Sequence, residues 1–212
     1  MMLTGILVGF LIATFLMVIA KRITALIRTF RIQSVFLFLY TLYMGLSQRR
    51  PELFVVCALV FALKVVAIPF VLARIMRRIN AEEDLGLIIN PQVSLVIAFI
   101  FAYLSYLFAS KAMGLEYSPV SIAFIASMTA VCIGFFLMVS RLKALGQVIG
   151  LLVMENAIFL AASVIAGGMP FFVEIAFFFD IFVFVVIIEV FVYKVNRLFT
   201  HIDTSKMQSL KG

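Results

Sequence analysis

Five ionisable side chains interrupt long apolar stretches of this sequence: Lys64, Glu155, Glu174, Asp180 and Glu189. A charged side chain at the centre of a membrane-spanning helix costs about 2.5–3.5 kcal/mol even on a lenient insertion scale. Such residues therefore face one another, water or a partner chain, and they commonly carry protons or ions. We predict that these five residues form a proton relay or an ion-translocation path.

Three of the five are expected at one depth. With a rise of about 1.5 Å per residue, Lys64, Glu155 and Asp180 lie roughly 15–18 Å below the outer ends of their helices. Glu174 falls near the outer mouth and Glu189 in the inner third of the same helix, and the three acids do not form one stripe. Glu174 and Glu189 either meet partners on different sides or reach the two membrane interfaces.

The surroundings of these charges are expected to be polar. Pro69 follows Lys64 by five residues, and a proline inside a helix removes a hydrogen bond and kinks the helix. Freed carbonyl groups beside a lysine make a spot that water can enter. Gln147 and Asn156, with Ser163, could extend a hydrogen-bonded path, although a local bond between helices is the favoured interpretation of each. A static ion pair, for example Lys64 with Glu155, is the alternative to a relay.

The usual redox and hydrolytic centres are missing from the sequence. The single histidine, His201, lies in a polar tail, so the two buried histidines of a membrane cytochrome are not available. Cys57 and Cys132 have no C-x-x-C spacing, and no P-loop, G-x-G-x-x-G, H-E-x-x-H or G-x-S-x-G motif is present. We therefore expect no catalytic centre, no metal and no cofactor in this chain itself.

The elements that must hold these residues are membrane helices. Hydrophobic residues make up 66% of the 212 residues and charged residues only 13%, which excludes an ordinary soluble domain. A spanning helix needs about 20 mostly apolar residues. The sequence predicts an all-α, polytopic membrane protein with one membrane domain over 1–212, including a cytoplasmic tail at 196–212. The seven predicted spans are 2–20, 30–46, 53–73, 92–110, 118–140, 144–166 and 170–195.

The basic residues predict the orientation of these spans. Thirteen of the 17 Lys and Arg residues follow the first, third, fifth or seventh span, three lie on the other side, and Lys64 is inside a span. Because cytoplasmic loops are enriched in Lys and Arg, the N-terminus is predicted outside and the C-terminus in the cytoplasm. The net charge of +7 is then a consequence of topology, and no nucleic-acid partner is expected.

Small residues recur at the spacing of close helix contacts. They are interpreted as plain packing seams between helices. The residues are Gly5, Gly9 and Ala13, then Ala126, Ala130 and Gly134, then Gly146 and Gly150.

The last two predicted spans resemble the hydrogenase-4 component E family. The likeness rests on the stretch GQVIGLLVMENAIFL at 146–160, on Gly168-Met169-Pro170, and on Val173-Glu174 followed by Phe179-Asp180. Lys64 with Pro69 and the segment Arg28–Gln33 look like the same family. The part at about 118–195 is similar to the small K-type subunit of proton-pumping NADH:quinone oxidoreductase and the C-type subunit of multisubunit cation/proton antiporters.

The resemblance implies a non-redox subunit in the membrane arm of a hydrogenase-4-type, formate-hydrogenlyase-type or complex I-like oxidoreductase. Its expected partners are antiporter-like and other membrane-arm subunits, a hydrogenase-like cytoplasmic module and the lipid bilayer of the inner (cytoplasmic) membrane. K-type subunits carry one glutamate in each of two neighbouring helices. Glu155 matches the first, and Asp180 or Glu174 the second.

Three functions follow as hypotheses. The first is proton or sodium translocation through Lys64, Glu155 and Asp180, coupled to electron transfer in partner subunits. The second is a structural linker whose buried charges are static. The third, an independent secondary transporter, is less favoured because no internal repeat and only one interior kink are visible.

Overall fold

The computed structural model describes residues 2–49, 51–78, 86–112, 114 and 118–165. Helices make up nearly all of this part of the chain, and it contains no strand beyond an isolated bridge between Leu87 and Arg141. The predicted all-α class is therefore confirmed for the described residues.

Six helical segments in the described part are long and apolar enough to cross a membrane. They overlap the first six predicted ranges, whereas the range 170–195 lies outside the described residues. The six segments are Met2–Ile19, Ile23–Gln48, Leu53–Arg77, Pro91–Lys111, Pro119–Ser140 and Ala144–Ile165.

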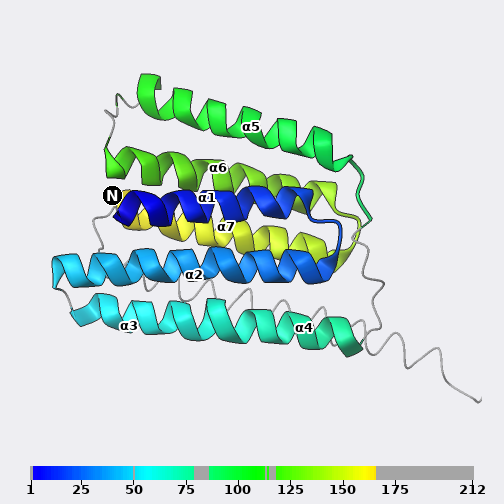
Figure 1. Ribbon diagram of the computed structural model, residues 1–212, viewed down its shortest axis with the longest axis horizontal. Helices are drawn as coiled ribbons and strands as arrows, with labels where there is room; N and C mark the ends of the chain where they lie inside the picture. Colours follow the sequence, from blue (N-terminus) through cyan, green and yellow to red (C-terminus); the bar gives the residue numbers. More distant parts are fainter. Residues whose placement is uncertain (1, 50, 79–85, 113, 115–117, 166–212) are drawn as a thin grey trace, which may run out of the picture.

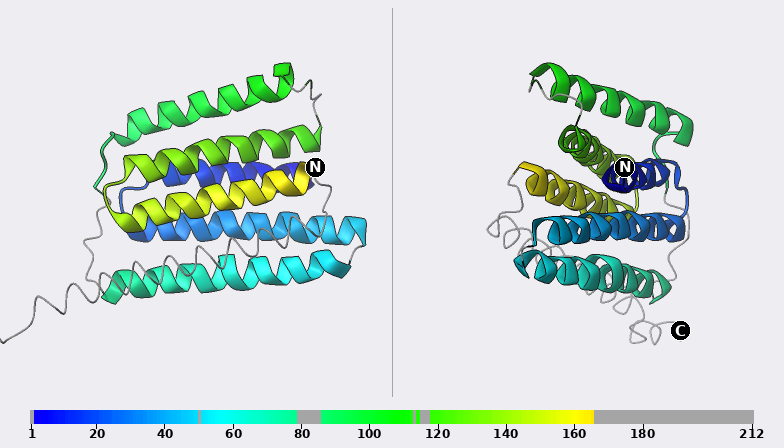
Figure 2. Two further views of the ribbon diagram at one scale, coloured as in Figure 1. Left: turned by 180° about the vertical axis from the view of Figure 1, so that it is seen from behind. Right: turned by 60° about the vertical axis from the view of Figure 1, so that its left-hand side comes forward.

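The helices form a bundle with a four-helix centre (Figure 1). Helix α1 (Met2–Ile19) packs on α2 (Ile23–Gln48) and α6 (Pro119–Ser140), while α7 (Ala144–Ile165) packs on α2 and α6. Helix α5 (Pro91–Leu107), continued by a short π-helix to Ala112, lies at one edge of the bundle. Figure 2 shows α3 (Pro51–Val60) and α4 (Ile68–Arg78) at the opposite edge, beside α2.

Helix α2 begins earlier than the predicted range of 30–46. It starts at Ile23 because an apolar pattern with helical spacing, Ile23, Leu26, Ile27 and Phe30, continues through the basic segment and is buried. Arg28 and the nearby Arg31 lie on the exposed face of the same helix rather than in a loop. A hydropathy window stops at such charges, whereas the helix continues because its buried face is uninterrupted.

The segment from Pro51 to Arg78 is one helical rod with a change of pitch at its middle. Helix α3 (Pro51–Val60) leads into a π-helix, η1 (Phe61–Ala67), and then into α4 (Ile68–Arg78). The Ile68 N–H donates to the Leu63 carbonyl, five residues back. Proline lacks the N–H that would continue α-helical bonding, and the wider π turns lie just before Pro69.

The backbones of α6 and α7 are in close contact. A Cβ atom added to Gly134 would lie 2.7 Å from the Met154 nitrogen, and one added to Gly150 would lie 2.7 Å from the Met138 nitrogen. Only glycine allows two helix backbones to approach this closely. The interpretation of these two glycines as a packing seam agrees with this geometry.

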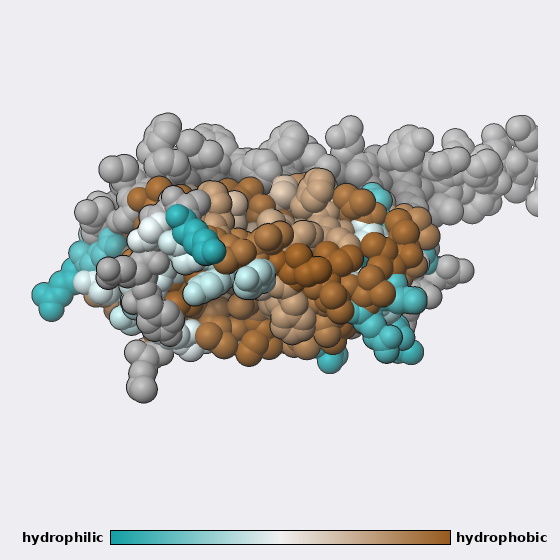
Figure 3. Space-filling view, turned by 90° about the horizontal axis from the view of Figure 1, so that it is seen from above, coloured by the Kyte–Doolittle hydropathy of each residue, from teal (hydrophilic) through white to brown (hydrophobic). Residues whose placement is uncertain are grey.

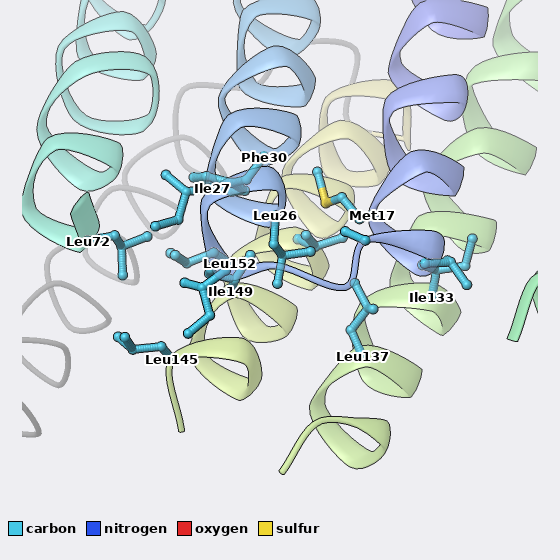
Figure 4. Packing of buried hydrophobic residues seen from close by; sticks show 14 of the residues in the cluster. Met17, Leu26, Ile27, Phe30, Leu72, Ile133, Leu137, Leu145, Ile149 and Leu152 are labelled. Carbon is cyan, nitrogen blue, oxygen red and sulfur yellow. The ribbon is translucent and has the colours of Figure 1, made fainter. Parts of the chain in front are cut away.

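Two clusters of buried apolar side chains form the interior. The first, near the start of α2, includes the inward-pointing side chains of Met17, Phe30, Leu72, Leu137 and Ile149 (Figure 4). The second lies toward the opposite end of the bundle and is formed by α1, α2, α3, α6 and α7, with Phe10, Leu37, Val60, Ala130 and Leu160 among its members.

The outer surface is apolar over much of its area. Large hydrophobic side chains such as Val96, Phe99 and Tyr103 of α5 are at least half exposed, and only 22% of the α5 span is buried. Figure 3 shows hydrophobic residues across the middle of one face and the most hydrophilic residues toward its ends. Such a surface suits lipid and not water, which indicates a membrane protein.

Candidate functional site

A layer of buried polar side chains separates the two hydrophobic clusters. On α1, on α2, on α7 and on the rod from α3 through η1 to α4, the polar position lies between residues of the first cluster and residues of the second. We call this set the polar layer. It consists of Thr14, Gln33, Ser34, Lys64, Glu155 and Asn156, each less than 5% exposed.

Lys64 and Glu155 form the charged part of the polar layer. Lys64 Nζ donates to Glu155 Oε1 at 3.0 Å, and both side chains are buried. The Phe159 ring, one turn beyond Glu155 on α7, has its centroid 5.7 Å from the same nitrogen. An aromatic face attracts a cation, so the ammonium group is held between a carboxylate and a ring.

The π-helix η1 carries Lys64 and turns it into the bundle. Within η1, Lys64 and Val65 are buried while the neighbouring Val66 is exposed. A π turn adds a residue to the helical repeat and therefore changes which side chains face inward. Pro69 itself is buried in the first turn of α4 and acts on the site through the backbone.

The neutral part of the polar layer is a hydrogen-bonded chain across three helices. Asn156 Nδ2 of α7 donates to Gln33 Oε1 at 3.2 Å and to Ser34 Oγ at 3.1 Å. Gln33 Nε2 donates to Thr14 Oγ1 at 2.8 Å, and the Thr14 hydroxyl donates to the Phe10 carbonyl at 2.9 Å. These donors all point the same way, from α7 through α2 to α1.

Two buried acceptors in the polar layer lack a donor. Glu155 Oε2 and Asn156 Oδ1 have no hydrogen-bond partner within the part of the chain that the structure describes. Buried polar atoms normally find a protein or water partner, and an unpaired one costs about 1–3 kcal/mol. Adjacent residues of α7 therefore offer two oxygen atoms that can accept hydrogen bonds from water.

The other predicted site residues lie elsewhere. Gln147 Nε2 donates to the Arg141 carbonyl at 3.0 Å, at the start of α7 and away from the polar layer. Ser163 donates to the Leu160 carbonyl of its own helix. Glu174, Asp180 and Glu189 lie outside the described residues.

Sequence analysis missed Thr14, Gln33 and Ser34 as members of the site. With α2 beginning at residue 30, Gln33 would lie in the first turn, near the membrane surface. With α2 beginning at Ile23, Gln33 lies about 15 Å into the helix. The adjacent polar residues Gln33 and Ser34, deep in an otherwise apolar span, were the sequence signal that could have identified this part of the site.

Arg141 is a buried structural residue at one end of the bundle. Its Nη2 donates to the carbonyls of Met17 and Val18 at 3.2 and 2.9 Å, in the last turn of α1. A cation at a helix C-terminus is favoured by the helix dipole. Burial lowers the pKa of the Arg141 guanidinium to about 10, so it stays protonated at neutral pH. Arg141 is one of the thirteen basic residues predicted on the cytoplasmic side. Its hydrogen bonds also hold α1 to the α6–α7 turn.

Comparisons with known proteins give one relative without a known activity. The chain is 26% identical over 204 residues to an uncharacterized protein of Mycobacterium tuberculosis, an alignment that covers 96% of this chain and 93% of the relative. No family model and no solved structure matches the chain. The similarity extends over nearly the whole length of both proteins and assigns no function.

Proposed function

We propose that this protein is a non-redox membrane subunit of a hydrogenase-4-type or complex I-like energy-converting complex. In this proposal it contributes to the translocation of protons, or of sodium ions, through Lys64, Glu155 and Asp180. Electron transfer takes place in partner subunits, among them a hydrogenase-like cytoplasmic module. The support for this complex type is the resemblance around Glu155-Asn156 and Lys64…Pro69 described above.

One observation supports the translocation role: only one of the two carboxylate oxygens of Glu155 accepts a hydrogen bond from Lys64. Oε1 accepts from the ammonium group, while Oε2 has no donor among the described residues. A proton arriving at Oε2 from water would neutralise the carboxylate and weaken its attraction for Lys64. Because the two groups are coupled, proton arrival at one changes the charge state or position of the other.

The proposed topology has seven spans, with the N-terminus outside and the C-terminus in the cytoplasm of an inner-membrane protein. The end of α1, the start of α2 and the end of α4 lie at the same end of the bundle as the α6–α7 turn (Figure 1). Exposed or turn-forming basic residues gather there, including Lys21, Arg22, Arg74, Arg77 and Lys143. This clustering is what a cytoplasmic face would have.

Copurification is the first test of the proposal. The full-length chain, tagged at its C-terminus, is extracted from native membranes in mild detergent, and the bound proteins are identified by mass spectrometry. The proposal expects antiporter-like membrane subunits and a redox module. A chain that purifies alone and transports a solute by itself in liposomes would instead be a secondary transporter.

Proton transport by the purified complex is the second test. In liposomes, Glu155→Gln and the double variant Lys64→Met/Glu155→Leu should both abolish ion transport while electron transfer by the partner subunits continues. The double variant removes both charges, and replacing a buried ion pair with apolar residues of similar size often preserves stability. Gln147→Ala, a polar change on the same helix outside the polar layer, should transport normally.

A structural linker is the second candidate function, and the direct contact of 3.0 Å between Lys64 and Glu155 favours it. A pair in contact can lock η1 to α7 without moving any ion. In that case the double apolar variant would assemble and transport at the wild-type rate. Normal transport by this variant therefore rejects the relay and leaves the linker.

A further inference from the structure

The outer face of the α3–α4 rod carries an apolar stripe that ends in two arginines. Two adjacent residues begin the stripe, the later members follow at intervals of three or four residues along one side of the rod, and all are exposed. They are Phe61, Ala62, Val66, Phe70, Arg74 and Arg77. Phe70 is 62% exposed and Val66 is 46% exposed, so the described part of the chain leaves these two side chains open. The Phe61 ring is 46% exposed and packs with one side on the Phe38 ring of α2, with the centroids 5.1 Å apart.

A small cavity lies at the basic end of this stripe. It has a volume of about 280 Å³, and its described lining consists of Phe70, Ala73, Arg74 and Arg77. On α4 these four residues occupy an arc of about 100°. Ligand sites range from about 300 to 1,000 Å³, so this one suits a compact headgroup.

The two arginines are available to an external anion. Both are exposed, and no hydrogen bond or ion pair joins either of them to another residue in the described part of the chain. Guanidinium groups bind phosphate oxygens through two parallel N–H donors, and positions i and i+3 lie side by side on a helix. The two side chains can therefore hold one phosphate between them.

The depth of the arginines matches a lipid headgroup. Lys64, in the layer between the two hydrophobic clusters, is ten residues before Arg74, which is about 15 Å along the helix. Half of a hydrocarbon core of about 30 Å is the same distance. The apolar stripe from Phe61 to Phe70 covers about 13 Å, close to the length of one leaflet. A free phosphate ion would use the arginines and leave this stripe without a role.

We propose that Arg74 and Arg77 bind the phosphate of an anionic phospholipid in the leaflet at the basic end of the bundle. Phe70 packs against the glycerol region, and an acyl chain follows Val66 and Phe61. This inference requires only that the α3–α4 rod spans the membrane, and it is independent of ion translocation.

Native mass spectrometry of the full-length protein tests this site. Phosphatidylglycerol, phosphatidylcholine and glycerol 3-phosphate are each titrated into the protein in detergent micelles. Each basic residue near a membrane surface contributes about fivefold to the binding of anionic lipid, so Arg74→Gln/Arg77→Gln should weaken phosphatidylglycerol binding on the order of 25-fold. Phe70→Ala should weaken the binding of the lipid and not that of glycerol 3-phosphate.

A matched control removes equal charge elsewhere. Arg28→Gln/Arg31→Gln changes two exposed arginines at the same spacing on α2. It should leave the affinity for phosphatidylglycerol within twofold of wild type. The proposal is overturned if both double variants weaken the lipid equally, if neither does, or if glycerol 3-phosphate binds as tightly as the lipid.

Discussion

Lys64 and Glu155 are 91 positions apart in the chain, and their side chains meet at 3.0 Å between two hydrophobic clusters. The π-helix η1 presents the lysine and α7 presents the glutamate. Removing either partner would leave the other charge buried without this contact. The contact therefore ties the stability of the bundle to the charge state of this pair.

Removing one partner of this pair should cost more than removing both. Glu155→Leu breaks the buried ion pair and leaves the Lys64 ammonium without this carboxylate, and removing one partner of such a pair typically costs about 3–5 kcal/mol. The double variant Lys64→Met/Glu155→Leu removes both charges of the contact, so neither is left buried without the other. Thermal unfolding in detergent should give a lower midpoint for the single variant than for the double. Equal midpoints would mean that water already reaches Lys64 in the folded protein.

Gln33→Leu should destabilise the protein although the new side chain is apolar and similar in size. The change removes the acceptor of Asn156 and the donor to Thr14, and unpaired buried groups cost about 1–3 kcal/mol. Gln92→Leu, at an exposed position in the first turn of α5, is the matched control. If the two variants unfold at the same temperature, the hydrogen-bonded chain contributes nothing to stability.

Gly150→Ala should separate α6 from α7. The new methyl group would lie 2.7 Å from the Met138 nitrogen, so a backbone must move, and overpacking of this kind costs about 1–3 kcal/mol. Gly5→Ala in α1 gains the same helix propensity, and its methyl group meets nothing within 4 Å. The yield of folded protein should fall for the first variant only. A similar yield for both would contradict the close contact.

Arg141→Met should destabilise the protein by the same amount at every pH from 6 to 9. Hydrogen bonds from a charged donor contribute about 1.5–3 kcal/mol, and here they end on α1 carbonyls. The folded-state pKa of about 10 is below the ordinary value of an arginine side chain, so burying the charged form costs stability below pH 10. That cost is lost only as the pH rises above 10, outside this range.

Unfolding midpoints of wild type and Arg141→Met across this pH range check the prediction. Arg28→Met, at an exposed position of α2, serves as the control for loss of a charge. A difference between wild type and Arg141→Met that changes between pH 6 and 9 would show that another titrating group depends on Arg141.

The helical class and the charged residues that are most costly to bury can be predicted from the amino-acid sequence. Long apolar runs exclude other folds because lipid leaves backbone groups no partner outside a helix or barrel. Lys64 and Glu155 stand out in the sequence because each is a charge in an apolar run. Gly134 and Gly150 were interpreted as seam residues from their spacing, and the backbone contacts agree with that interpretation.

Which polar groups meet depends on how the helices pack, and the sequence does not predict it. Hydropathy placed the start of α2 at residue 30 instead of Ile23, so Gln33 and Ser34 were not expected deep in the bundle. The true start depends on the burial of one helix face, and that burial depends on neighbours that are distant in the chain. The pairing of Lys64 with Glu155 depends on the π turns of η1, and a change of helical pitch leaves no mark in a count of apolar residues. Periodicity fixes which face of a helix is buried, but the packing of four helices fixes what that face touches.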